Sequence, residues 1–343
     1  MMIKKVEIFF KENGIEPGEA RAEANFLVCA VSGLSIEEIT LGANIQNEDE
    51  IWALAKKRVE TKAPIQHIVG FSYFMGDKFF VTPDVLIPRP ETEILVQKSI
   101  EIVKKLAEQA IEVSAKKHGN KDVISGQNLV AQSFNILDIG TGSGCIALEI
   151  AKNLPELACV DKSAGATSST LQAIGRNHNM RALKSAAAPS LEVLGVDIST
   201  SALHVALKNM EALVQERRVV FRKSDIFSSI YDDEKFDIIV SNPPYIPILA
   251  KDTLDDVVKN FDPSIALFTQ DKDGVEFYEK ILKGAKKHLK PNGYVLFEIG
   301  FTNGISQSAI VAEIARSYDF AMEFIEKDLS GIDRVMGFSR QCP

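Results

Sequence analysis

Residues 242–245 combine an amide, two prolines and an aromatic ring at the end of a mainly apolar run. The run Phe236–Ser241 is short and rich in β-branched residues, which is typical of a buried strand. The residues that follow are Asn242, Pro243, Pro244 and Tyr245. Paired prolines fix φ and remove backbone donors, so we expect a rigid turn at the carboxyl end of this strand.

Such a turn suits the binding of one planar NH2 group. The side-chain carbonyl of Asn242 and the main-chain carbonyl of Pro243 can each accept one hydrogen, and Tyr245 can stack on a flat group. Orientation of this kind can lower a barrier by roughly 7–11 kcal/mol. We therefore expect these three residues to be catalytic in N-alkylation, and Pro244 to help bind the substrate.

A glycine-rich turn lies upstream, between the apolar run Asn135–Ile139 and a helix that begins near Cys145. Glycines let a backbone turn tightly and approach a ligand closely, and the helix start offers free amides. We expect a nucleotide-like cofactor here. The expected contacts are Asp138, Gly140, Thr141, Gly142 and Gly144, and we expect Asn242 of the proline turn to contact the same cofactor. The spacing opposes NAD, because a dinucleotide turn has the pattern G-x-G-x-x-G and the third glycine here comes one residue early.

Two acidic residues end the next two predicted strands. Asp197 is placed to accept bonds from the ribose hydroxyls of the cofactor, with Ile198 beside it, although Asp197 could instead cap the helix at Thr200. Asp225 is placed to bind an adenine amino group while Ile226 packs on the ring. A surface turn is the alternative role for Asp225.

The elements around these residues alternate strand and helix from Phe134 onward, which predicts an α/β fold: a Rossmann-like mixed sheet of seven strands covered on both faces. Predicted strands are 135–139, 191–196, 219–222, 236–240, 294–298 and an antiparallel hairpin at 321–327 and 333–338. Predicted helices are 145–153, 200–215, 275–289 and 304–318. We expect a helix end and loop at 109–132, and a mobile insertion at about 157–190, which is poor in large apolar residues.

The first part of the chain predicts a different organisation. Residues 1–68 show helical periodicity and predict a small helical, substrate-binding domain, and residues 69–92 predict a β-hairpin and a Pro-Arg-Pro linker before the main domain at 93–343. We expect four residues of the linker to form a wall of the substrate site, although the arginine could simply pair with an acidic neighbour. These residues are Arg89, Pro90, Glu91 and Thr92.

Composition narrows the class of protein. The 343 residues carry a net charge of −8, which opposes broad binding to nucleic acid because such binding needs a basic excess. The four cysteines form no ligand cluster, so we expect no metal. No apolar run approaches the length of a membrane span, and the start lacks the core of a signal peptide. We expect a cytoplasmic protein, and a monomer.

The chain resembles the release factor glutamine N5-methyltransferases, the HemK/PrmC family, over nearly its whole length. The motifs that carry the resemblance are the loop Ile87–Glu93, the turn Asp138–Gly144, Asn242–Tyr245, the segment Asp262–Leu267, Glu298 and the late strand Gly331–Val335. The resemblance implies S-adenosylmethionine as cofactor. It also implies that Asn242 and Pro243 hold the glutamine amide of a Gly-Gly-Gln loop in a class I release factor.

Three other functions stay open on the residues alone. Asn-Pro-Pro-Tyr also occurs in adenine-N6 methyltransferases, which flip a base onto the aromatic ring but need a basic cleft or a target-reading domain. An NAD-dependent oxidoreductase is disfavoured by the glycine spacing. A binding protein that retains the fold without activity is the third.

Overall fold

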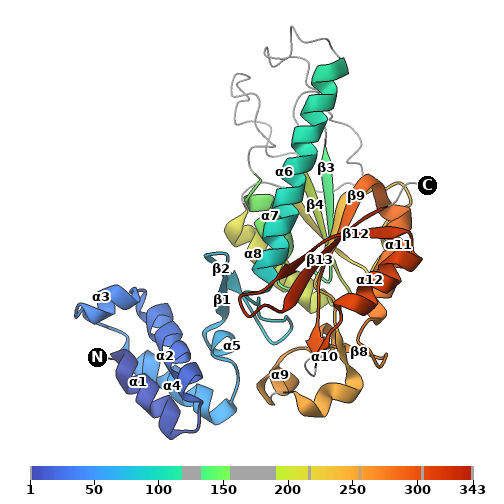
Figure 1. Cartoon of the computed structure of the whole chain (residues 1–343). Helices are drawn as coiled ribbons and strands as arrows, with labels where there is room; N and C mark the ends of the chain where they lie inside the picture. Colours follow the sequence, from blue (N-terminus) through green and yellow to red (C-terminus); the bar gives the residue numbers. More distant parts are fainter. Residues whose placement is uncertain are drawn as a thin grey trace, which may run out of the picture.

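The computed structural model describes residues 2–117, 133–154, 191–214, 218–254, 256–302 and 305–340. Five helices form the N-terminal part of the chain, drawn in blue in Figure 1. They are α1 (Met2–Glu12), α2 (Pro17–Ser32), α3 (Ile36–Thr40), α4 (Glu48–Thr61) and α5 (Ile65–Val69). Their apolar faces meet in a separate core around Phe10, Leu27 and Ile51, each fully buried. Helical periodicity in this segment therefore reflects a bundle with a core of its own.

A hairpin connects this bundle to the rest of the chain. Strands β1 (Phe71–Phe74) and β2 (Asp77–Phe80) pair antiparallel across a Met75-Gly76 turn, as the sequence predicted. After the Pro-Arg-Pro loop, α6 runs from Thr92 to Lys117, so the helix end expected within 109–132 belongs to this helix.

A seven-stranded sheet forms the centre of the main domain, with the strand order β12-β13-β9-β6-β3-β4-β5. Its strands are β3 (Phe134–Ile139), β4 (Leu191–Asp197), β5 (Val219–Lys223), β6 (Phe236–Ser241), β9 (Leu289–Glu298), β12 (Phe320–Lys327) and β13 (Asp333–Arg340). The first five run parallel, and β13 lies antiparallel to both β9 and β12. The predicted mixed sheet with a terminal antiparallel hairpin is confirmed.

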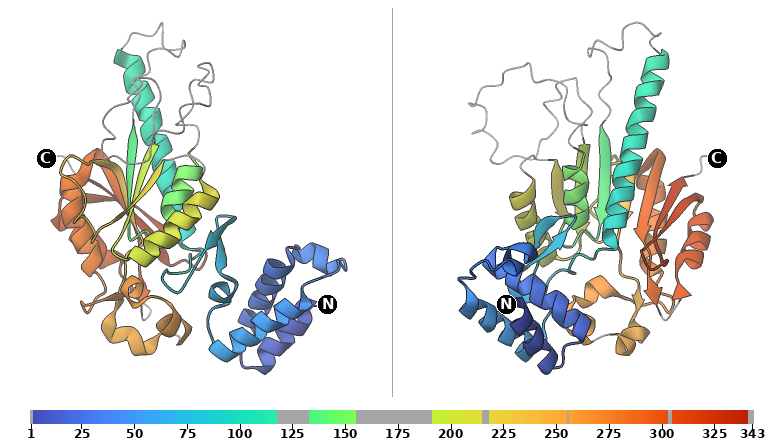
Figure 2. Two further views of the ribbon diagram at one scale, coloured as in Figure 1. Left: turned by 180° about the vertical axis from the view of Figure 1, so that it is seen from behind. Right: turned by 60° about the vertical axis from the view of Figure 1, so that its left-hand side comes forward.

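Helices cover both faces of this sheet, as Figures 1 and 2 show. They are α7 (Cys145–Lys152), α8 (Thr200–Leu213), α11 (Glu276–His288) and α12 (Ser308–Ser317), together with α6. Side chains alternate between the faces: Ile238 and Val240 of β6 join the core under α6 and α7, whereas Ile239 joins the core under α11 and α12. The central strands β3 and β6 are buried along nearly their whole length because both faces of the sheet are covered there.

The segment between β6 and α11 contains short elements that the sequence patterns did not predict. It contains β7 (Ile246–Pro247), the 3-10 helix η2 (Ile248–Thr253), α9 (Asp256–Phe261), α10 (Ser264–Leu267) and β8 (Phe268–Thr269). Elements this short produce no readable periodicity, because a pattern needs several turns or alternations. Similarly, α12 begins at Ser308 rather than at 304, since a small hairpin of β10 (Phe301–Thr302) and β11 (Ile305–Ser306) precedes it.

Two further predictions fall largely outside the described residues, namely the insertion at 157–190 and the loop within 109–132. Within the described ranges, we find no helix with the length and apolar character that crossing a bilayer requires.

Candidate active site

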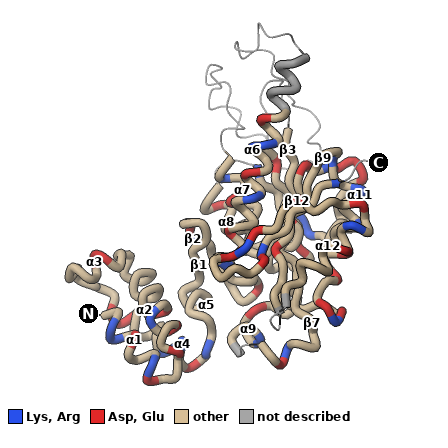
Figure 3. The backbone as a smooth tube through the Cα atoms, viewed as in Figure 1, with Lys and Arg blue, Asp and Glu red and all other residues tan. Residues whose placement is uncertain are grey.

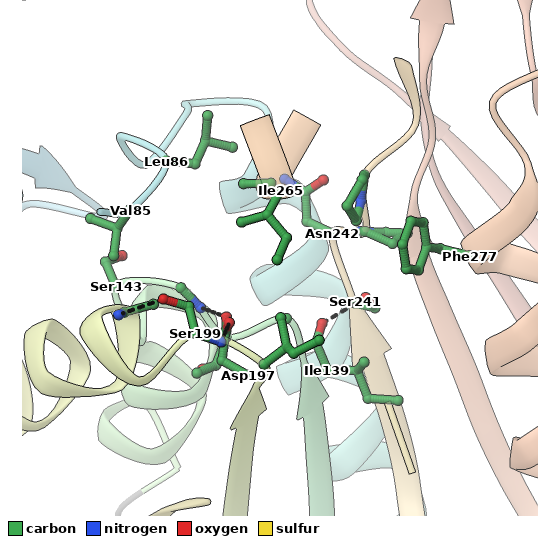
Figure 4. A pocket seen from close by; sticks show the side chains of 18 of the residues that line it. Val85, Leu86, Ile139, Ser143, Asp197, Ser199, Ser241, Asn242, Ile265 and Phe277 are labelled. Atoms are coloured by element: carbon green, nitrogen blue, oxygen red, sulfur yellow. Dashed lines mark hydrogen bonds between the residues drawn. The ribbon is translucent and has the colours of Figure 1, made fainter. Parts of the chain in front are cut away.

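A cavity of about 530 Å³ lies at the carboxyl ends of β3, β4 and β6. The linker loop before α6 and the segment around α10 form its other walls (Figure 4). Segments that line it include Val85–Arg89, Gly140–Ser143, Asp197–Ser199, Ser224–Ile226 and Ser241–Pro244. The glycine turn and the proline turn, about a hundred residues apart in sequence, therefore face one cavity. This is where parallel sheets bind their ligands, because the loops after neighbouring strands meet at one edge.

The glycine turn needs its glycines for two different reasons. All three adopt a positive φ: 72° at Gly140, 54° at Gly142 and 82° at Gly144. A Cβ on Gly140 would meet no protein atom within 4 Å, and Gly140 and Gly142 line the cavity. A Cβ on Gly144 would lie 3.0 Å from the Phe221 ring, and Gly144 is not in the lining. The first two glycines leave room for a ligand, and the third lets α7 pack closely.

Asp138 supports the turn from beneath and does not line the cavity. Thr141 donates a hydrogen bond of 2.6 Å from Oγ1 to Asp138 Oδ2. Burial raises the pKa of this carboxyl to about 7. Because side chains alternate along a strand, Asp138 points to the α7 side while Ile139 lines the cavity. In this structure Asp138 contacts Thr141, which does line the cavity, and the cofactor contact expected for Asp138 stays a prediction.

Asp197 holds two backbone amides at the mouth of the turn. Its Oδ2 accepts from Gly142 N at 2.9 Å and its Oδ1 accepts from Ser199 N at 2.8 Å. Ser199, not Asp197, caps α8, because its hydroxyl accepts from Ala202 N. Each carboxylate oxygen keeps a further lone pair for a ligand hydroxyl. Asp197 and the neighbouring Ile198 both line the cavity, as the predicted ribose contact requires.

Asp225 and Ile226 lie on the next loop, and both line the cavity. Asp225 is exposed. Ile226 has a φ of 51°, an outlying conformation for a β-branched residue, which presents a large apolar side chain at the cavity wall. Strain held at a cavity wall is typical of ligand sites.

Three side chains from distant parts of the chain meet at the proline turn. Asn242 Nδ2 donates to Thr92 Oγ1 at 3.3 Å, and Thr92 Oγ1 donates to Glu298 Oε2 at 2.6 Å. Thr92 and Glu298 are each 3% exposed, and burial raises the pKa of Glu298 to about 7. Asn242, Pro243, Pro244 and Thr92 all line the cavity. Asn242, the predicted acceptor for the substrate amide, is therefore linked through Thr92 to a buried carboxyl.

Tyr245 turns away from the cavity lining. Its ring lies against Gly300, where a Cβ would be 2.6 Å from Cδ2, and its carbonyl accepts a 2.9 Å bond from Gln307 Nε2. Burial raises the pKa of its phenol to about 12. In this conformation Tyr245 anchors the turn. Its stacking on a substrate is not what the structure displays, and that role stays a prediction.

The predicted linker residues also differ in whether they line the cavity. Arg89 forms a 3.0 Å ion pair with Asp262, the alternative considered for it. It also lines the cavity, and its role in binding a substrate there stays a prediction. Pro90 and Glu91 are not among the lining residues. One residue that sequence reasoning missed is Phe277, in the first turn of α11, which lies on the Asn242 side of the cavity (Figure 4). An aromatic residue in the first turn of a predicted helix was its only signal.

Charge at the cavity is acidic on balance. Acidic and basic residues are interspersed along the described backbone (Figure 3). The charged residues of the lining are Asp84, Asp197, Asp225, Glu276, Arg89 and Lys280. Four acids against two bases repel a phosphate backbone. Among the residues with described structure, no cluster of three His, Cys, Asp or Glu side chains has a metal-binding arrangement.

Comparison with known proteins identifies relatives over most of the chain. A methyltransferase domain family matches residues 131–303. The release factor glutamine methyltransferase of Bacteroides thetaiotaomicron is 32% identical, with 94% of each chain covered. That of Flavobacterium psychrophilum is 32% identical over 83% of this chain and 78% of its own. A bifunctional methyltransferase of Rickettsia prowazekii is 34% identical over 92% of this chain, which spans about half (53%) of that relative.

Proposed function

Because the chain belongs to the release factor glutamine methyltransferase family, we propose that it methylates the side-chain amide nitrogen of the glutamine in the Gly-Gly-Gln motif of class I release factors. The observation that carries the proposal is that Asn242, Pro243 and the glycine turn line one cavity. An amide nitrogen held by Asn242 and Pro243 would face a methyl donor bound at the glycine turn.

The cavity fits S-adenosylmethionine. The open space at Gly140 accommodates a ligand against the backbone. Asp197 presents carboxylate oxygens for ribose hydroxyls, and Ile198 and Ile226 present apolar surface for a flat base. When bound, this cofactor supplies a methyl group on a positively charged sulfur, which departs as a neutral thioether.

The protein's contribution is orientation of the acceptor nitrogen. Asn242 Oδ1 and the carbonyl oxygen of Pro243 each accept one N–H of the substrate amide, so both hydrogens are held and the nitrogen lone pair is directed toward the methyl carbon. With the cofactor held at the glycine turn and Asp197, its methyl carbon would bond to this nitrogen as its bond to sulfur breaks. The extra proton leaves the nitrogen afterwards, so the residues need not supply a general base.

Labelled S-adenosylmethionine distinguishes this activity from its alternatives. We expect label on a class I release factor and none on its Gln→Ala variant or on an adenine-containing DNA duplex. Label on the duplex alone would instead indicate an adenine-N6 enzyme. Absence of label on all three, with the cofactor bound in calorimetry, would indicate a binding protein without activity.

A further inference from the structure

The hydrogen-bonded chain Asn242–Thr92–Glu298 has a direction that depends on one proton. We propose that ionised Glu298, acting through Thr92, fixes the Asn242 amide with its oxygen toward the cavity, and that protonation of Glu298 reverses the chain and disables the acceptor site. Glu298 and Thr92 are positioning residues in this role. The inference rests on the proposed methyl transfer, since it concerns the same site.

An ionised carboxylate can only accept hydrogen bonds. The Thr92 hydroxyl has one hydrogen, which goes to Glu298 Oε2 over 2.6 Å, so its oxygen remains to accept from Asn242 Nδ2 at 3.3 Å. The amide is thereby oriented with Nδ2 toward Thr92. Its Oδ1 is left for the cavity side, where a substrate N–H must find an acceptor.

A protonated carboxyl permits the opposite order. Glu298 can then donate to Thr92 Oγ1, and the Thr92 hydroxyl turns its hydrogen to Asn242, which presents Oδ1 to it by rotating its amide. Nδ2 would then face the cavity and meet the substrate NH2 donor to donor. This arrangement cannot hold the acceptor nitrogen, so the chain switches the site rather than merely loosening it.

The surroundings of Glu298 bring the pKa of its carboxyl close to neutral pH. Burial raises its pKa to about 7, against the hydrogen bond from Thr92, the nearby Asn242 amide and the charge of Arg334 on β13, all of which favour ionisation. The charge of Glu91 in the linker opposes ionisation. The phenols of Tyr245 and Tyr278 and the thiol of Cys145 also face this carboxyl, and burial keeps all three neutral by raising their pKa values.

The pH dependence of methyl transfer tests the inference. In the wild type, kcat on a release factor should be full above about pH 7 and fall about tenfold per pH unit well below it, because only the ionised form orients Asn242. Glu298→Gln removes the titrating group, and its amide can both accept from and donate to Thr92. Its kcat should therefore be lower than that of the wild type at pH 8 and should lack the acidic limb.

Substitutions at Thr92 supply the matched pair. Thr92→Val keeps the shape of the side chain and removes the hydroxyl, so kcat should fall up to about 100-fold, while Thr92→Ser should restore most of it. Cofactor affinity by calorimetry, measured over the same pH range, should change little in either variant. Equal kcat in the Val and Ser variants, or an acidic limb retained in Glu298→Gln, would overturn the inference. A wild type without activity on any release factor would instead reject the proposed function.

Discussion

Asn242 and Pro243 illustrate how few atoms the proposed chemistry needs at the scale of single residues. In the proposed reaction two carbonyl oxygens would hold one NH2 group, and neighbouring residues support the turn that carries them. Gln307 binds the carbonyl of Tyr245, and Tyr278 donates from its hydroxyl to the carbonyl of Glu298 at 3.0 Å. The bond to Tyr245 holds the backbone at the end of the proline turn, which lowers the cost of orienting a substrate there.

Removal of the Asn242 side chain should separate catalysis from cofactor binding. Asn242→Ala deletes the proposed acceptor of a substrate N–H and the amide that donates to Thr92, so we expect kcat to fall by about 100-fold or more, with cofactor affinity by calorimetry close to that of the wild type. Asn47→Ala, at an exposed position of the helical bundle, is a control that should leave both unchanged. Loss of cofactor binding together with activity would mean that Asn242 supports the fold.

The turn between β3 and α7 shows at the scale of elements that similar backbone angles serve different ends. Gly140 and Gly144 differ by only 10° in φ (72° and 82°), yet one opens on the cavity and the other on packed side chains. Alanine at either position is strained by about 1–2 kcal/mol, because its Cβ disfavours this conformation. Any further effect of an alanine depends on the atoms that surround each position.

We expect Gly140→Ala and Gly144→Ala to differ in the property that they damage. Gly144→Ala adds contacts at 3.0–3.2 Å with Phe221, Ala206 and Leu148, so its free energy of unfolding in urea should fall by about 1 kcal/mol more than that of Gly140→Ala. Gly140→Ala places a methyl group in the cavity and should weaken cofactor binding more strongly. The opposite assignment would show that the cofactor does not approach the turn at Gly140.

The ion pair of Arg89 and Asp262 links two distant segments at the scale of the whole molecule. It joins the linker between the bundle and the main domain to the loop before α10, 173 residues away, on the two sides of the cavity. Asp262 is buried, which raises the pKa of its carboxyl, and its Oδ1 has no hydrogen-bond partner. The pair therefore ties the cavity walls together and compensates a carboxylate held away from water.

Breaking this pair should affect stability and substrate binding together. Arg89→Ala leaves the buried Asp262 unpaired and should lower the free energy of unfolding by about 1–3 kcal/mol, below the cost for a fully buried pair because the Arg89 side chain is 43% exposed. KM for the release factor should rise. In Arg89→Ala/Asp262→Asn the carboxylate is gone, so stability should partly return. Additive losses in the double variant would show that the two residues do not interact energetically.

Sequence alone determined the order of elements and the two turns that face the cavity. The apolar run before Asn242 and the glycines after Ile139 have local signals, because strand burial and positive φ restrict residue types at those positions. The alternation of elements then implied a parallel sheet, and with it the meeting of both turns at one edge. The same local rules could not read the short elements between β6 and α11.

Tertiary structure alone decided which side chains reach the cavity and what stands behind them. Asp138 and Ile139 are neighbours in sequence, yet only Ile139 lines the cavity, because the side on which each strand residue falls depends on where the sheet is covered. Thr92 and Glu298 are separated by 206 residues and form a 2.6 Å bond that no local pattern encodes. Local chemistry selects the candidates, whereas long-range packing assigns them their partners.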